Sequence, residues 1–144
     1  MKHLHKLFPL FILGLLSQPI FGQYFAPKNY PKDYFIYPVK DVRKSLSANF
    51  GELRVNHYHM GLDCRTDQAE NKTVVAAADG YVSRISVAPF GYGRAIYINH
   101  PNGLTTVYGH LNKFFPQLEK YLKEKQYEKE SWAVSLEFSP EQFP

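Results

Sequence analysis

The stretch NHYHMGLD, residues 56–63, places two histidines and an aspartate around a single glycine. His59 and Asp63 are four positions apart, so their β-carbons would lie about 6 Å apart on a helix and about 13 Å apart on a straight strand. Gly61 disfavours a helix and permits a bend, and a turn leading into a strand can then bring both side chains to one ion. An imidazole nitrogen with a carboxylate oxygen suits Zn²⁺, whose catalytic sites usually have three protein ligands and an open position for water.

Simpler structural explanations exist for these and other candidate residues. The His59 and Asp63 side chains could bond only to the backbone of a polar loop. His57 could replace a ligand in a rearranged site. We interpret Cys64 as a small buried strand residue rather than a metal or redox group, and as the single cysteine of the chain it can form no internal disulfide. His100, in the turn NHPNG, is expected to be solvated.

A third histidine follows the strand-like run LTTVYGHL. Strict alternation places Thr106, Tyr108 and His110 on one face and Val107 and Leu111 on the other. We interpret the second face as the core face, so that His110 points away from it, to solvent or into a groove. His110 is then either an exposed histidine at the end of a strand or an imidazole that orients a metal-activated water and stabilises an oxyanion.

The elements that must position these side chains are short β-type runs between turn signals, from about residue 50 to residue 111. The pairs Asp79-Gly80 and Asn102-Gly103 each separate two apolar runs, which predicts two hairpins. The loop PFGYGR lacks the Lys-Ser/Thr ending of a phosphate-binding loop and precedes a strand-like run rather than a helix. The body of the chain is therefore predicted to be an antiparallel β-sheet.

The charged, glycine-free segment at residues 115–130 differs from this pattern. Its apolar residues Leu118, Tyr121 and Leu122 have helical spacing and form one narrow stripe, which predicts a helix that docks on the sheet. A further strand is predicted downstream from the alternation of apolar and polar residues. Its apolar positions are Trp132, Val134, Leu136 and Phe138.

Five linked segments, FGELR, HMGLD, VVAAADGYVSRI, GYGRAIYINHPNG and TTVYGHL, occur in this order over about residues 50–114. Together they resemble the lysostaphin/LytM-type zinc metallopeptidases, which cleave peptide bonds in bacterial peptidoglycan. The resemblance implies a mainly β fold, an antiparallel β-sheet groove related to the duplicated hybrid motif, with the helix at about 115–130 as an insertion. It also implies that His59 and Asp63 bind zinc and that His110 is catalytic.

The chain departs from the family pattern downstream. The family takes its third zinc ligand and a second catalytic histidine from a His-x-His motif, and no histidine follows His110. We therefore expect residues 50–144 to be the N-terminal part of the metallopeptidase domain, incomplete at its C-terminus and inactive by itself, while the complete product hydrolyses peptidoglycan peptides. The alternative is a non-catalytic LytM-like module that binds the cell wall or activates other wall hydrolases.

Three more residues are candidates for contact with the substrate. Arg54 in FGELR could orient a substrate carboxylate or backbone, or could be a surface charge. Tyr92 and Tyr108 could line the groove, although aromatic residues in sheets are more often packing residues.

The N-terminal residues 1–22 have the layout of a secretory signal, in which Lys2 and Lys6 flank the apolar run Leu7–Leu16 and cleavage follows Gly22. The run is too short to span a membrane, so no transmembrane anchor is expected after cleavage. The protein is expected to be exported, to a periplasm or to the extracellular cell wall. Loss of the two lysines lowers Lys plus Arg from 17 to 15 against 13 acidic residues, a net charge of +2. No dense basic run remains, which argues against nucleic acid as a partner.

The segment between the signal and the β-rich body, residues 23–49, is rich in proline and aromatic residues. Each proline fixes its own φ and biases the preceding residue towards extended backbone. We therefore predict an extended lead-in that lies along the domain.

Overall fold

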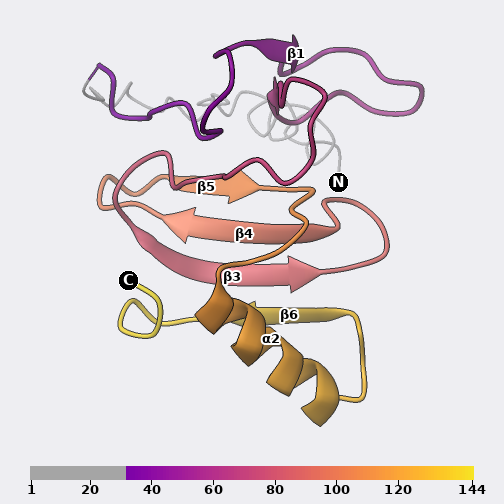
Figure 1. Ribbon diagram of the computed structural model, residues 1–144, viewed down its shortest axis with the longest axis vertical. Coiled ribbons are helices and arrows are strands. Elements are labelled where there is room, and N and C mark those ends of the chain that lie inside the picture. Colours follow the sequence, from indigo (N-terminus) through magenta and orange to yellow (C-terminus); the bar gives the residue numbers. More distant parts are fainter. Residues whose placement is uncertain (1–31) are drawn as a thin grey trace, which may run out of the picture. The chain divides into compact units, whose positions relative to one another are not determined.

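The computed structural model describes residues 32–144. The predicted signal at residues 1–22 and the first part of the lead-in lie outside the described residues. The described elements, in chain order, are β1 (Leu46–Ala48), β2 (Asp63–Cys64), β3 (Tyr81–Val87), β4 (Arg94–Asn99), β5 (Thr105–Tyr108), α2 (Pro116–Glu128) and β6 (Val134–Glu137) (Figure 1). Within residues 32–144, no helix is both long and apolar enough to cross a membrane.

Four strands form an antiparallel sheet in the order β5-β4-β3-β6 (Figure 1). The central strand β3 pairs with both neighbours, so that Ile85 lies opposite Ile96 of β4 and opposite Leu136 of β6. Strands β1 and β2 form a separate two-stranded antiparallel sheet. The mainly β class with one helix, predicted from the sequence, is confirmed for the described residues.

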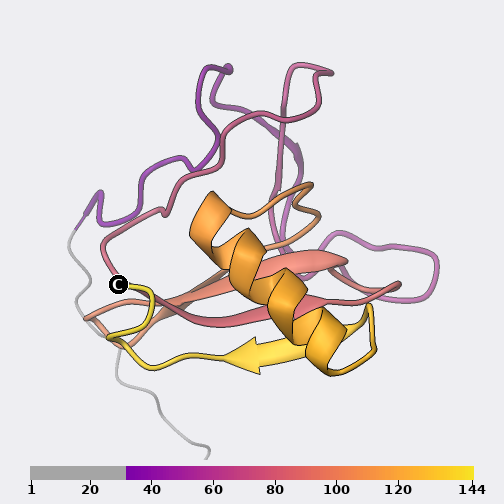
Figure 2. The ribbon, with the colours of Figure 1, turned by 60° about the horizontal axis from the view of Figure 1, so that its bottom comes forward.

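The core lies between the four-stranded sheet and α2, which lies across one face of the sheet (Figure 2). Leu118 and Leu122 are fully buried and pack in one cluster with Ile85 and Val87 of β3. Burial of a leucine or isoleucine side chain stabilises a fold by about 1.5–3 kcal/mol, so this cluster is a main source of stability. The predicted helix and its apolar stripe are therefore confirmed.

The predicted downstream strand is also present, as β6. It begins at Val134, two positions later than the first apolar residue of the predicted alternation, and Trp132 is exposed. Val134, Leu136 and Phe138 are buried in the core cluster.

One of the two predicted hairpins is confirmed. The Asn102-Gly103 turn joins β4 to β5. The His100 amide donates to the Leu104 carbonyl at 2.9 Å, which closes the turn. Gly103 has φ +82°, a backbone conformation that glycine adopts without steric cost.

The hairpin predicted at Asp79-Gly80 is wrong. The residues before it pair with the lead-in instead: the Val75 amide donates to Pro38 O at 2.9 Å, and the Ile36 amide donates to Ala77 O at 2.8 Å. A β-carbon on Gly80 would lie 2.3 Å from the Asn99 carbonyl oxygen. Glycine at position 80 therefore lets the backbone approach β4 closely. In the sequence, this tertiary requirement cannot be distinguished from a turn signal.

The predicted faces of β5 are also wrong. Val107 is 43% exposed, whereas Thr106 and Tyr108 are half-buried. The reason is that β5 is an edge strand whose inner face is polar and hydrogen-bonded. Leu111 does pack against the core, but it comes after the strand, and His110 has φ +57° and interrupts the alternation.

His100, predicted to be solvated, is 5% exposed. Its Nδ1 lies 2.8 Å from Asp79 O, and its Nε2 lies 2.8 Å from Thr106 Oγ1. A carbonyl only accepts, so Nδ1 carries the proton and Nε2 accepts from the threonine hydroxyl. Thr106 Oγ1 is in turn 2.9 Å from the Tyr108 hydroxyl, which accepts the Ala77 amide at 2.7 Å. Every polar group of this buried chain has a partner, which is why the histidine can be buried.

Candidate metal centre

A short hairpin, residues 51–59, positions His59. The Gly51 amide donates to His59 O and the His59 amide donates to Glu52 O, both at 2.8 Å. At the tip, the Arg54 amide donates to His57 O at 2.8 Å. Residues of FGELR thus form the first arm of this His59 hairpin, and the second arm ends at His59, the first residue of HMGLD.

Asp63 is the first residue of β2, where it pairs with Ala48 of β1. The chain bends at Gly61, between the two candidate ligands. As a result, His59 Nε2 lies 3.1 Å from Asp63 Oδ1. The structure therefore brings together the histidine and the aspartate that the sequence pattern paired.

The other imidazole nitrogen fixes the tautomer of His59. Its Nδ1 lies 2.9 Å from the Asn49 carbonyl oxygen, and since a carbonyl only accepts, Nδ1 carries the proton in the neutral ring. Nε2 then presents a lone pair to the carboxylate oxygen of Asp63. Two acceptors that face each other repel unless a proton or a metal cation lies between them.

The spacing and chemistry of this pair fit zinc. Two ligand atoms at about 2.0–2.2 Å from a tetrahedral zinc are roughly 3.3–3.6 Å apart, slightly more than the 3.1 Å between Nε2 and Oδ1. A histidine ligand commonly donates its second N–H to a backbone carbonyl, as His59 does to Asn49. Within residues 32–144, no group of three or more His, Cys, Asp or Glu side chains is placed to hold a metal.

His110 and Tyr92 form a second group. The His110 amide donates to Tyr92 O at 2.8 Å, and both side chains are exposed. A β-carbon on Gly109 would lie 3.1 Å from Tyr92 Cδ1, so glycine lets the tyrosine ring approach this backbone. Among the described residues, no hydrogen bond or ion pair connects this group to His59 or Asp63.

Residues 57–127 match peptidase family M23. This part of the chain is an M23 domain of the lysostaphin/LytM type. Comparison with curated proteins and with solved structures gave no match.

Membership of the M23 family fits the chemistry of the pair. Enzymes of this family are peptidases that act on peptidoglycan, outside the cytoplasm, and they typically depend on zinc. The matched range contains His59, Asp63, Tyr92, Tyr108 and His110, together with nearly all of α2.

Arg54 lies outside the matched M23 range, and the structure gives it a contact that the sequence did not suggest. Its Nη2 lies 3.2 Å from Asp63 Oδ2. From the sequence, Arg54 is a candidate substrate contact or a surface charge, and no periodicity or motif points to Asp63. The two residues are nine positions apart and meet only because of the His59 hairpin.

The other candidates have structural partners. His57 is exposed and bonds to Asn56 Oδ1 at 2.7 Å, away from the pair. Cys64 is half-buried in β2, beside Tyr37, whose hydroxyl donates to Ser45 O at 2.8 Å. Burial raises the pKa of Tyr37, and the Cys64 thiol raises it further. The Tyr108 hydroxyl is engaged with the Ala77 amide and Thr106, which makes this side chain a link between segments.

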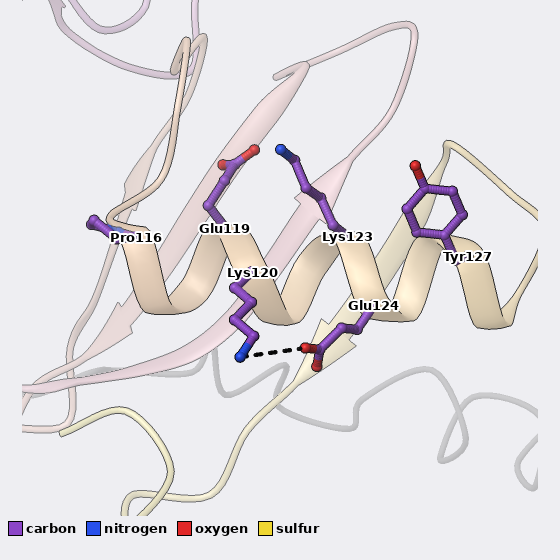
Figure 3. Close-up of a pocket in the computed structure, with 6 residues that line it drawn as sticks. All are labelled: Pro116, Glu119, Lys120, Lys123, Glu124 and Tyr127. Carbon is purple, nitrogen blue, oxygen red and sulfur yellow. Dashed lines mark ion pairs between the residues drawn. The ribbon is translucent and has the colours of Figure 1, made fainter.

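The hollows of the described surface lie away from the pair. One lies along the outer side of α2 and is lined by Pro116, Glu119, Lys120, Lys123, Glu124 and Tyr127 (Figure 3). Another lies on the polar face of the four-stranded sheet, around Tyr81, Arg84 and Tyr97. Neither of these two hollows is lined by His59 or Asp63.

Proposed function

We propose that the protein is a zinc-dependent endopeptidase that hydrolyses peptide bonds in bacterial peptidoglycan. The observation that carries the proposal is the pair itself: His59 Nε2 lies 3.1 Å from Asp63 Oδ1, close to the spacing of two ligands of one zinc ion. The M23 match at residues 57–127 supports the substrate class.

Each residue has a separate task in this proposal. Zinc, when bound, supplies an activated water and polarises the scissile carbonyl. His59 and Asp63 hold it, and Asn49 keeps the proton of His59 on Nδ1. His110 has an exposed ring and a backbone fixed by Tyr92, and its imidazole would orient the water and donate a hydrogen bond to the developing oxyanion. Tyr92 would contact the substrate beside it.

Activity in this proposal needs a third zinc ligand in addition to His59 and Asp63. Affinity for a metal comes from several preorganised donors, so a polypeptide that supplies only these two binds zinc weakly and is inactive. The second candidate function is a non-catalytic module that binds the cell wall or activates other wall hydrolases.

We also propose that residues 1–22 direct export and are removed. The site would then act in a periplasm or at the cell wall, where its substrate lies. The supporting features are the paired lysines and the short apolar run of the leader.

The proposed roles are tested with the full natural polypeptide on purified peptidoglycan, with release of free amino groups and bound zinc both measured. His59→Ala is expected to lose zinc and activity together, whereas His110→Ala retains zinc and loses turnover by about 10²–10⁴-fold. His57→Ala is the matched control, since the His57 side chain bonds to Asn56 and the substitution keeps its backbone carbonyl, and it should keep both zinc and activity. Undiminished turnover in His110→Ala would refute the catalytic role, and binding to peptidoglycan without cleavage would favour the second candidate.

A further inference from the structure

We infer that Arg54 is a positioning residue that fixes the carboxylate of Asp63 for the metal. The inference rests on the proposed zinc centre and adds to it a residue outside the matched M23 range. It predicts that removal of Arg54 weakens zinc binding, although removal of a positive charge beside a cation site would by itself strengthen it.

The two oxygens of Asp63 have different partners. Oδ2 accepts from Arg54 Nη2 at 3.2 Å, while Oδ1 faces His59 Nε2 at 3.1 Å. Rotation about the last torsion of an aspartate is broad and poorly restrained by itself, and the side chain of Asp63 is 48% exposed. The contact with Arg54 therefore selects the orientation in which a single oxygen points to the metal position.

The backbone links Arg54 to the histidine ligand as well. Its amide donates to His57 O at 2.8 Å, and the adjacent Leu53 forms a bridge with Tyr58. Arg54 is thus part of the same hairpin that positions His59. One short element holds the histidine through its backbone and the aspartate through the Arg54 side chain.

Two effects of Arg54 on zinc binding have opposite signs. The guanidinium repels a cation, an effect that solvent and salt screen at a half-exposed site. It also orients a ligand, and loss of such supporting partners typically costs 10–100-fold in metal affinity. Because the Arg54–Asp63 pair is partly exposed, we expect a net loss near the lower limit, about tenfold.

The test is a zinc titration of the full natural polypeptide followed by NMR, with the imidazole nitrogens of His59 and the backbone amides as reporters. Arg54→Ala should raise the zinc dissociation constant about tenfold, and Arg54→Lys, which keeps the charge and one donor, should recover part of this loss. Arg65→Ala is the matched control. It removes the same charge two positions after Asp63, but Arg65 bonds to Leu46 O rather than to a carboxylate.

The direction in which the zinc dissociation constant changes in Arg54→Ala decides whether the inference holds. An unchanged or lower dissociation constant in Arg54→Ala would overturn the inference and leave the proposed function intact. A tenfold loss in Arg65→Ala as well would also overturn it, because the loss would then not depend on the contact between Arg54 and Asp63. If wild-type protein shows no zinc shift at His59, the proposed function itself fails. Should Arg54→Ala not fold, Arg54→Gln, which keeps a donor without the charge, is expected to bind zinc with intermediate affinity.

Discussion

The helix–sheet unit, β3 to β6 with α2, buries one cluster of large apolar side chains between the sheet and the helix. The segment around His59 and Asp63 instead exposes its large apolar side chains. The exposed set lies within 13 residues of sequence and comprises Phe50, Leu53, Val55, Tyr58, Met60 and Leu62. Backbone hydrogen bonds of the His59 hairpin and a few polar contacts position the pair. The helix–sheet unit is therefore stabilised by the burial of apolar side chains. The positions of His59 and Asp63 depend instead on local hydrogen bonds and polar contacts.

This contrast has consequences for local stability. Segments with little buried apolar surface and exposed backbone hydrogen bonds open more readily than a packed core. A ligand that binds only the closed form stabilises it. Zinc is therefore expected to order the His59 hairpin much more than it changes the helix–sheet unit.

The largest expected effect compares two identical substitutions in the two regions. Leu118→Ala removes a side chain that is 0% exposed and should cost about 2–5 kcal/mol of unfolding free energy, since it leaves a cavity between α2 and β3. Leu53→Ala, at 78% exposure in the His59 hairpin, should change it by less than about 0.5 kcal/mol. Denaturant unfolding measures both. Equal losses of unfolding free energy in the two variants would show that the two regions do not differ in how much burial stabilises them.

The elements predicted correctly are those whose signals are local. The stripe of α2 follows from helical periodicity, and the Asn102-Gly103 hairpin follows from turn chemistry between adjacent strands. The approach of His59 to Asp63 likewise needs only a bend at Gly61, within five residues.

The incorrect predictions concern partners that are distant in sequence. Gly80 resembles a turn residue, but its role is a close approach to Asn99. His100 is buried because Asp79, 21 positions away, supplies a carbonyl to Nδ1. Arg54 meets Asp63 through a hairpin that neither residue predicts. Such contacts depend on tertiary geometry, which periodicity and turn signals do not specify.

Two ion pairs of α2 differ in how exposed they are, and we expect them to contribute differently to stability. Arg94 of β4 pairs with Glu119, both less than a quarter exposed, and its guanidinium lies 4.6 Å from the Phe114 ring centroid. Arg94→Met should cost about 2 kcal/mol, because it leaves a partly buried carboxylate without its charge partner. Lys120 and Glu124, 4.0 Å apart on the outer side of the helix (Figure 3), are the control, and Lys120→Met should cost less than about 1 kcal/mol. A larger loss of unfolding free energy in Lys120→Met than in Arg94→Met would mean that the Arg94–Glu119 ion pair does not stabilise the packing of α2 on the sheet.

The smallest expected effect is a pH dependence next to the β1–β2 sheet. The pKa of Tyr37 is raised in the folded protein, so folding favours the protonated phenol. This contribution to stability is complete below the unfolded pKa of about 10 and is lost as the pH rises through the higher folded value. Thermal unfolding should show a steeper loss of stability above about pH 10 in wild type than in Tyr37→Phe. Tyr127→Phe, at an 83% exposed position of α2, should retain the wild-type slope, and a slope unchanged in Tyr37→Phe would contradict the assignment.

The central claim, that His59 and Asp63 bind one metal ion together, is tested most directly by anomalous diffraction at the zinc edge from crystals of the protein grown with zinc. We predict an anomalous peak at about 2.0–2.2 Å from both His59 Nε2 and Asp63 Oδ1, with His59 Nδ1 still bonded to Asn49 O. Zinc bound at His57 or His110 instead, or a His59–Asp63 contact that excludes the metal, would contradict the account.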